Sequence, residues 1–226
     1  MNDIFQHPNR SGAFPPVIQA LLIGNGVVFL LQGFGGFGLL VDFALWPLGT
    51  PDYVQGQYGY QEVPQFQLWQ LVTYSFLHGG LFHLLINMFV LWMFGTQMEY
   101  LWGSRRFVVY YFVCVIGAGL MQLLVTSFDA GGPIYPTVGA SGGVFGLLLA
   151  FGMRFPNQYI LLLIPPIPMK AKYFVFLIGG IELFFGVSGT QAGVAHFAHL
   201  GGMAAGLLMI LYWAGVLPIK PRTRNW

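Results

Sequence analysis

The stretch Gly139-Ala140-Ser141-Gly142-Gly143-Val144-Phe145-Gly146 leads directly into an apolar segment. A second apolar segment carries Ala195-His196-Phe197-Ala198-His199-Leu200-Gly201-Gly202. A hydroxyl and an imidazole are costly to place on helices that lie in hydrocarbon. The least costly arrangement is one in which the two side chains meet. A serine that meets a histidine forms a nucleophile with its base, so this pair is the first candidate for a functional site.

The composition predicts an integral membrane protein. Of the 226 residues, 56% are hydrophobic and only 7% are charged, whereas a soluble domain carries about a quarter charged residues. A membrane-spanning helix needs about 20 apolar residues, and six stretches approach that requirement: 17–45, 79–100, 107–128, 140–155, 172–188 and 192–214. These long runs do not alternate as the strands of a membrane barrel do. We therefore expect an all-α membrane protein, a bundle of six transmembrane helices.

The same pattern predicts one helical domain over 17–214, between a short tail at 1–16 and another at 215–226. The N-terminus shows no short apolar region with a clear cleavage site, so we expect no removed signal peptide. Cys114 is the only cysteine, which excludes an internal disulfide. The net charge of +2 is too small to indicate a nucleic-acid partner.

The positive charges predict the orientation. All nine Lys and Arg residues lie in one alternating set of segments, the two tails and every second loop: Arg10, Arg105, Arg106, Arg154, Lys170, Lys172, Lys220, Arg222 and Arg224. Because positive charge is enriched on the cytoplasmic side, both termini are predicted to be cytoplasmic. The loop 46–70 is then external. Its aromatic residues favour the headgroup region: Trp46, Tyr53, Tyr58, Tyr60, Phe66 and Trp69.

Three polar residues are predicted at one depth. The second, fourth and sixth spans all run inward, and His83, Ser141 and His199 each lie about 15 residues before the inner end of their span. At 1.5 Å per residue, each is roughly 20–25 Å above the inner boundary. Matching depth on three separate helices favours one shared site in the outer part of the membrane.

The roles within that site follow from helical spacing. His83 and Asn87 are four residues apart and share a face, so both could donate hydrogen bonds, together with the Ser141 amide, to a developing oxyanion. His199 shares a face with Gly202 and Gly206, whose spacing allows close helix contact. It is therefore favoured over His196 as the base. Taken singly, such a serine or histidine more often only satisfies local hydrogen bonds.

These motifs together resemble the rhomboid family of intramembrane serine proteases. The similarity covers about residues 70–210. It rests on His78-x4-His83-x3-Asn87, Gly139-x-Ser141-Gly142, Ala198-His199-x2-Gly202-x3-Gly206 and the segment Glu99-Tyr100-Leu101-Trp102-Gly103-Ser104-Arg105-Arg106. Two positions depart from the pattern of some members, Gln70 in the first loop and Phe145 after the serine. The first puts the anchoring of the loop in question, and the second the tuning of the histidine.

The resemblance implies a six-helix core with a Ser–His dyad and no acidic third member. Ser141 would be the nucleophile and His199 the base, while His83, Asn87 and the Ser141 amide would form the oxyanion hole. His78, together with His83, could hold water near the site. The fifth span would border the entry route of a substrate helix, and residues 46–70 would be a partly embedded loop. No cofactor is implied.

The resemblance also implies a substrate class and a location. The expected substrates are membrane proteins, single-span or other, whose helix is weak near its outer end, because a regular helix hides its carbonyls. By analogy with compact six-span members, a bacterial inner membrane is expected. The oligomeric state and the natural substrate do not follow from the sequence.

Four other classes of protein share single features of this sequence. A soluble α/β-hydrolase would need a strand before Ser141 and a charged surface. A metalloenzyme could use His78, His83, His196 and His199, but the sequence has no His-Glu-x-x-His motif and no carboxylate near them, so no metal is expected. A catalytically silent relative that binds transmembrane clients is the main alternative. A transporter would rest on Glu182 inside the fifth span, where an interhelical hydrogen bond is the simpler interpretation.

Overall fold

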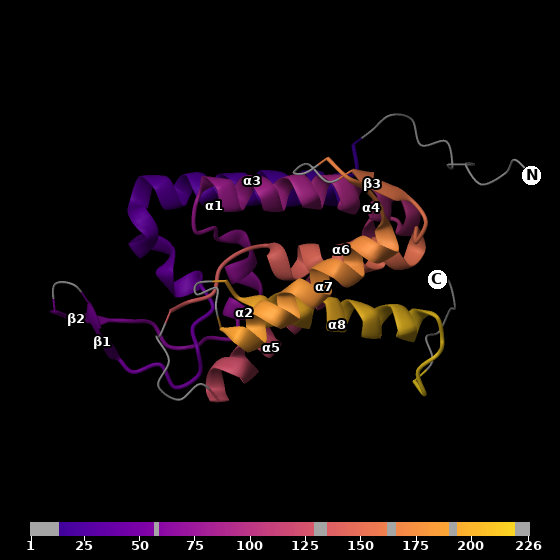
Figure 1. Cartoon of the computed structure of the whole chain (residues 1–226). Coiled ribbons are helices and arrows are strands. Elements are labelled where there is room, and N and C mark those ends of the chain that lie inside the picture. Colours follow the sequence, from indigo (N-terminus) through magenta and orange to yellow (C-terminus); the bar gives the residue numbers. More distant parts are fainter. Residues whose placement is uncertain (1–13, 57–58, 129–134, 162–165, 190–193, 220–226) are drawn as a thin grey trace, which may run out of the picture.

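The predicted apolar segments fold as helices in the computed structural model, which describes residues 14–56, 59–128, 135–161, 166–189 and 194–219 (Figure 1). The first predicted span corresponds to α1 (Pro16–Leu40), and the second to α3 (Leu81–Val90), the π-helical turn η3 (Leu91–Gly95) and α4 (Thr96–Trp102). The other four predicted spans correspond to α5 (Ser104–Phe128), α6 (Ser141–Arg154), α7 (Ala171–Ser188) and α8 (His196–Trp213). The predicted tails lie mostly outside the described residues.

The helices differ in their capacity to cross a membrane. Among the described residues, five helical segments are long and apolar enough to do so, and α6 is apolar but has only 14 residues. Its length of about 21 Å is shorter than a hydrocarbon core of about 30 Å. The count of six spans therefore stays a prediction, as does the cytoplasmic position of both termini. Most residues of α6 are buried, so this helix lies inside the bundle rather than at its lipid-facing surface.

Two loops of the predicted all-α fold contain short β-hairpins that the sequence did not indicate. The loop 46–70 contains an antiparallel hairpin of β1 (Tyr53–Gly56) and β2 (Gly59–Glu62), which projects beyond one end of the bundle (Figure 1). A second hairpin pairs β3 (Tyr159–Leu161) with β4 (Pro168–Lys170) before α7. Both lie outside the helical segments, where backbone groups need other partners. Three short helical turns complete the first loops: η1 (Val41–Phe43), α2 (Gln70–Thr73) and η2 (Tyr74–Phe76).

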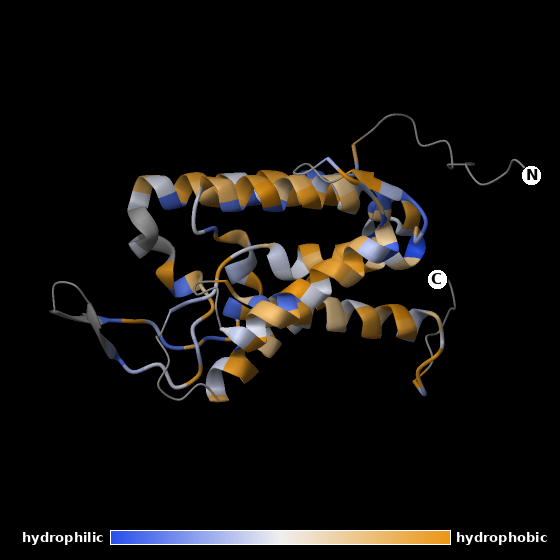
Figure 2. Cartoon of the chain, viewed as in Figure 1, coloured by the Kyte–Doolittle hydropathy of each residue, from blue (hydrophilic) through white to orange (hydrophobic). Residues whose placement is uncertain are grey.

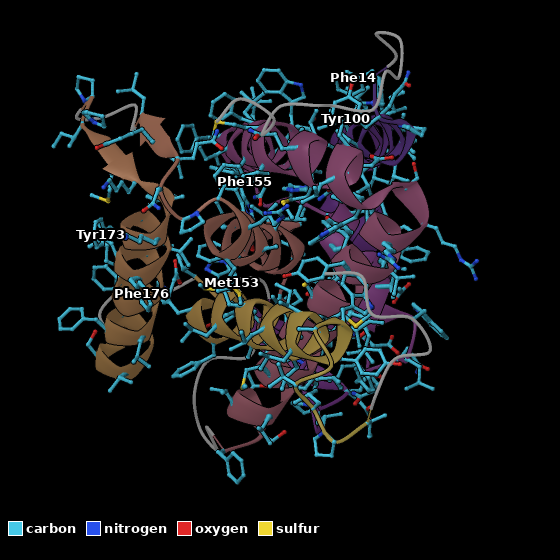
Figure 3. All side chains as sticks on the ribbon, turned by 90° about the vertical axis from the view of Figure 1, so that its right-hand side faces the viewer. Phe14, Tyr100, Met153, Phe155, Tyr173 and Phe176 are labelled. Carbon is cyan, nitrogen blue, oxygen red and sulfur yellow. The ribbon has the colours of Figure 1, made fainter. Side chains whose placement is uncertain are left out.

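The outer surface of the bundle is apolar. Figure 2 shows apolar residues along the outward faces of the helices, and Phe34 and Phe176 remain 89% and 80% exposed. Figure 3 shows Phe176 on α7 pointing away from the other helices. Such a continuous exposed apolar surface would drive aggregation in water. Contact with lipid tails accounts for it, in agreement with the predicted membrane protein.

Glycines bring three helices into close contact at the centre of the fold. A Cβ atom on Gly202 of α8 would collide with the carbonyl oxygen of Gly142 on α6, and one on Gly146 would collide with Cys114 of α5. The Tyr110 hydroxyl on α5 donates a hydrogen bond of 2.8 Å to the carbonyl of Gly146. The predicted contact between the glycine faces of the fourth and sixth spans is therefore confirmed. It sets the distance between the first turns of α6 and α8.

A buried carboxylate fixes the opposite end of the bundle. Glu99 of α4 accepts hydrogen bonds from the backbone N–H groups of Val17 (3.0 Å) and Ile18 (2.8 Å) at the start of α1. These donors have no partner within their own helix, and the carboxylate also complements the positive end of the helix dipole. Trp102 packs on Trp213, with ring centroids 5.6 Å apart. The start of α1 and the ends of α4 and α8 therefore lie at the same end.

The close contact at Gly202 predicts that adding a methyl group there destabilises the protein, whereas the same change at an open position does not. Gly202→Ala should lower the free energy of unfolding by about 1–3 kcal/mol, because α6 and α8 must separate to admit the Cβ atom. Gly180→Ala on α7 is the matched control, since a Cβ atom there meets nothing within 4 Å. Thermal unfolding in detergent compares the two variants. Equal stability of both would contradict the close contact.

Candidate active site

Ser141 is the first residue of α6, and the turn before it depends on a glycine. Gly139 has a φ of 129°, which residues with a side chain rarely adopt, and its N–H donates to the carbonyl of Tyr74 at 3.0 Å. This turn leaves the Ser141 hydroxyl at the start of the helix. The first backbone N–H groups of a helix have no intrahelical acceptor and carry a partial positive charge. The position therefore suits a group on which negative charge develops.

His199 faces this hydroxyl from the first turn of α8. Its Nε2 lies 2.8 Å from the Ser141 Oγ, within hydrogen-bond distance. The ring of Phe145 stacks on His199, with centroids 4.2 Å apart and planes inclined by 6°. The sequence predicted that the hydroxyl and the imidazole meet, and this contact is present. His196 instead directs its Nδ1 toward Glu182.

The expectation that no acidic group stands behind the histidine is wrong. The Oε2 atom of Glu182 on α7 lies 2.8 Å from His199 Nδ1 and 2.7 Å from His196 Nδ1. The carboxylate therefore forms an interhelical contact between α7 and α8, which was the simpler of the two interpretations of this residue. The transporter hypothesis rested on an unpaired glutamate in a span, and this pairing removes its support.

The same contact corrects the statement that no carboxylate lies near the histidines. Glu182, His196 and His199 offer three possible metal-ligating atoms within 4.8 Å of one another. Ligands around tetrahedral zinc at about 2.0–2.1 Å would lie roughly 3.3 Å apart. The two distances of 2.7 and 2.8 Å to one oxygen are instead those of charge-assisted hydrogen bonds. The donor set thus fits a hydrogen-bonded cluster better than a metal site.

His83 lies near Ser141 and lines the same cavity. A Cβ atom on Gly139 would be 2.9 Å from His83 Nε2 and 3.7 Å from Ser141 Oγ, so the two groups flank the same point of the backbone. The backbone N–H of Gly79 donates to His83 Nδ1 at 3.4 Å. Because Nδ1 accepts, the ring proton of a neutral imidazole is on Nε2. His83 therefore presents an N–H donor on the side that faces the serine.

Asn87 and His78 are less clearly directed at Ser141 than His83 is. Asn87 lines the same cavity as Ser141, but one N–H of its amide already donates to the His83 carbonyl at 2.8 Å. His78 packs edge-on against His83, with centroids 5.1 Å apart, and its two ring nitrogens make no hydrogen bond to the residues that the structure describes. Burial, and then the nearby His83, lower the pKa of His78 from 6.5 to about 4. Its ring is thus neutral at neutral pH.

A cavity of about 640 Å³ opens beside the Ser–His pair. It is walled by α3, α6, α7 and the start of α8, and its lining is mostly apolar, including Ile86, Val90, Leu148, Phe174 and Ile178. The polar groups converge at one place, where Ser141, His199, His83 and Asn87 line the wall. An apolar cavity with a few convergent polar groups is typical of a substrate site.

Gln70, one of the two departures from the family pattern, anchors the first loop. Its side chain is fully buried and its amide makes contacts in three directions. The oxygen accepts from the Trp46 N–H at 3.2 Å, while the nitrogen donates to the carbonyls of Asp42 (2.9 Å) and Gln65 (3.2 Å). This role was missed, because the partners are backbone groups and leave no mark in the sequence.

Comparison with known proteins gives a family match that covers the residues of this site. The model of the rhomboid domain matches residues 65–215, which include every residue of the site described above. The protein called Rhomboid protein 1, mitochondrial, from Saccharomyces cerevisiae (strain ATCC 204508 / S288c), is 32% identical over 115 residues. That alignment covers 51% of this chain but only 33% of the relative. The chain is an integral, multi-pass membrane protein and belongs to the rhomboid family.

Proposed function

We propose that this chain is an intramembrane serine endopeptidase that cleaves transmembrane proteins near the outer end of a membrane helix. The observation that carries the proposal is the 2.8 Å contact between Ser141 Oγ and His199 Nε2 at the wall of the apolar cavity. A hydroxyl hydrogen-bonded to an imidazole is the arrangement of an activated nucleophile. Family membership supports the same reaction class.

In the proposed reaction, Ser141 Oγ attacks the carbonyl carbon of the scissile bond while its proton passes to His199 Nε2. The electron pair of the carbonyl moves to its oxygen, which becomes an oxyanion. The backbone N–H of Ser141, His83 Nε2–H and the remaining amide hydrogen of Asn87 are the donors proposed to stabilise it. His199 then gives the proton to the leaving nitrogen, and water, which His78 and His83 are proposed to help retain, hydrolyses the acyl-enzyme.

The proposed substrate segment enters between α3 and α7. Both helices line the cavity, α3 through Ile86 and Val90 and α7 through Phe174 and Ile178. Figure 3 shows α7 at the outside of the bundle, beside α6 and α8. An apolar wall suits the side chains of a membrane helix, but the scissile carbonyl must be released from its own helix. Small or helix-breaking residues near the cleavage point should therefore favour cleavage.

The site would face the outer side of the membrane, with both chain termini cytoplasmic. Support comes from the placement of the positive charges and from the common end at which α1 begins and α8 ends. A bacterial inner membrane, which was expected by analogy, has no support from the relative described above, whose name is mitochondrial. We therefore propose a lipid bilayer as the location and name no particular cellular membrane.

The proposal predicts that cleavage depends on Ser141 and His199. In liposomes that contain a single-span substrate, Ser141→Ala and His199→Ala should each lower the cleavage rate by at least about 10³-fold, because the nucleophile or its base is lost. Ser127→Ala is the matched control, since the Ser127 hydroxyl only bonds its own helix, to Leu123, at 2.7 Å. Gel analysis with mass spectrometry of the fragments measures the rates.

Two outcomes would contradict this account. Cleavage retained by both variants would remove the protease function. Substrate binding without any cleavage by the unaltered protein would favour the alternative of a catalytically silent member that holds transmembrane clients.

The geometry of the oxyanion donors predicts an order of effects. His83→Ala should lower kcat by about 10²–10³-fold with little change in KM, because the loss concerns the transition state. Asn87→Ala should cost less, since part of its amide is already bonded to the His83 carbonyl. Steady-state kinetics in detergent compares the two variants. A larger loss for Asn87→Ala than for His83→Ala would reverse the proposed assignment.

A further inference from the structure

The cluster of Glu182, His196 and His199 is not explained by a Ser–His dyad. Their side chains are 11%, 6% and 11% exposed, so all three are largely removed from solvent. Burying a carboxylate is costly unless hydrogen-bond donors satisfy it. One oxygen of Glu182 lies within 2.8 Å of a ring nitrogen of each histidine. Helix packing in a membrane does not by itself explain why a carboxylate lies between these two histidines.

The local structure directs both histidines toward α7. His196 and His199 are three residues apart in the first turn of α8, so they share one face of that helix. Gly186 of α7 allows the approach, since a Cβ atom there would lie 3.3 Å from the His196 Cβ and 3.2 Å from the Phe197 ring. Phe185 stacks on His196 at 5.7 Å. The carboxylate is thus held between two rings on a neighbouring helix.

The direction of the hydrogen bonds fixes the tautomers. An ionised carboxylate only accepts hydrogen bonds, so the Nδ1 atoms of both His196 and His199 carry the proton. The Nε2 of a neutral His199 is then a free acceptor, and it faces the Ser141 hydroxyl at 2.8 Å. The Nε2 of His196 is buried and has no hydrogen-bond partner within the described part of the chain. An unused lone pair there costs less than the unused N–H that the other tautomer would leave.

We propose that Glu182 is a positioning residue for His199 and the third member of a Ser–His–Glu arrangement, with His196 holding the carboxylate in place. This inference rests on the proposed function and deepens it. In the resting site, Glu182 selects the tautomer of His199 that can accept the serine proton. During attack, the Ser141 proton moves to His199 Nε2, and the resulting imidazolium lies next to the carboxylate, which stays ionised. When the proton passes to the leaving nitrogen, the ring returns to its Nδ1–H form.

The kinetic prediction concerns Glu182→Gln, which keeps the size of the side chain and removes its charge. Its amide can donate to His199 Nδ1 and so favours the tautomer that has no free Nε2. We expect kcat to fall about 10²–10⁴-fold with KM little changed. Glu62→Gln, the same change at the exposed last residue of β2, is the matched control and should behave as the unaltered protein. Glu182→Asp should recover part of the loss, because it restores the charge on a shorter side chain.

The pH–rate profile separates positioning from a purely structural role. The groups that face His199 are Ser141 from α6, Glu182 from α7, His196 from its own helix and His83 from α3. Of these, only Glu182 offers the imidazolium an opposite charge. Its replacement by Gln should move the acidic limb of the profile to lower pH, since the protonated ring loses that stabilisation. A change in packing alone would lower the rate and leave the limb in place.

Nitrogen NMR of histidine-labelled protein tests the tautomer without any measurement of activity. The unaltered protein should show His199 with the proton on Nδ1, and Glu182→Gln should show a shift toward the Nε2–H form. An unshifted tautomer together with unchanged kcat in folded Glu182→Gln would overturn the proposal. Stoichiometric zinc in the purified protein, lost on Glu182→Gln, would overturn it in favour of a metal site.

Double substitution distinguishes this inference from the function on which it rests. If Glu182 acts through His199, then adding Glu182→Gln to His199→Ala should cause no further loss of residual cleavage. An additional loss would contradict the positioning role and leave the Ser–His pair intact. Cleavage that persists in Ser141→Ala would instead defeat the proposed function itself, whatever the effect of Glu182.

Discussion

The contact between the backbones of α6 and α8 is the constraint on which the rest of the site depends. Because Gly202 of α8 has no side chain, the backbone carbonyl of Gly142 on α6 can lie directly against α8. This contact places the first turns of the two helices at a separation that a serine and a histidine side chain can bridge. Larger residues would separate the helices, and the hydroxyl and imidazole would then each need another partner. In a membrane such partners are scarce, because lipid tails offer none.

The polar groups of the site form a connected set rather than a collection of isolated exceptions. Ser141 meets His199, His199 meets Glu182, and Glu182 meets His196, so four buried or partly buried side chains are joined by hydrogen bonds across α6, α7 and α8. Their cost in an apolar bundle is offset by these hydrogen bonds. The same connection links chemistry to the position of α7. α7 supplies both Glu182 and one wall of the cavity. The position of this helix therefore affects both the orientation of His199 and the volume available to a substrate.

Much of this arrangement was predictable from local sequence patterns. Long apolar runs located the helices, and the helical spacing of Gly142, Gly146, Gly202 and Gly206 indicated which faces approach each other. That spacing is what favoured His199 over His196. The short length of α6 was harder to foresee, because the small-residue turn before Ser141 is itself apolar. The two hairpins were also missed, since strands of three or four residues in a loop leave little periodic signal.

The contacts of Glu182 could not be predicted from local sequence patterns. It precedes the two histidines by 14 and 17 residues and belongs to another helix. Periodicity places a residue on a face of its own helix but does not identify the helix that this face meets, so the carboxylate was recognised only as an unusual group in a span. Gln70 was missed for a related reason, because its partners are backbone atoms. Both residues hold elements together through contacts that depend on tertiary structure alone.

The most direct test of the central claim is the reaction of the purified protein, in lipid, with a fluorophosphonate probe, followed by mass spectrometry of the labelled peptide. The account predicts one phosphonyl group on the Oγ atom of Ser141, the hydroxyl hydrogen-bonded to an imidazole. Folded protein that stays unlabelled, or that carries the label on another side chain, would contradict it.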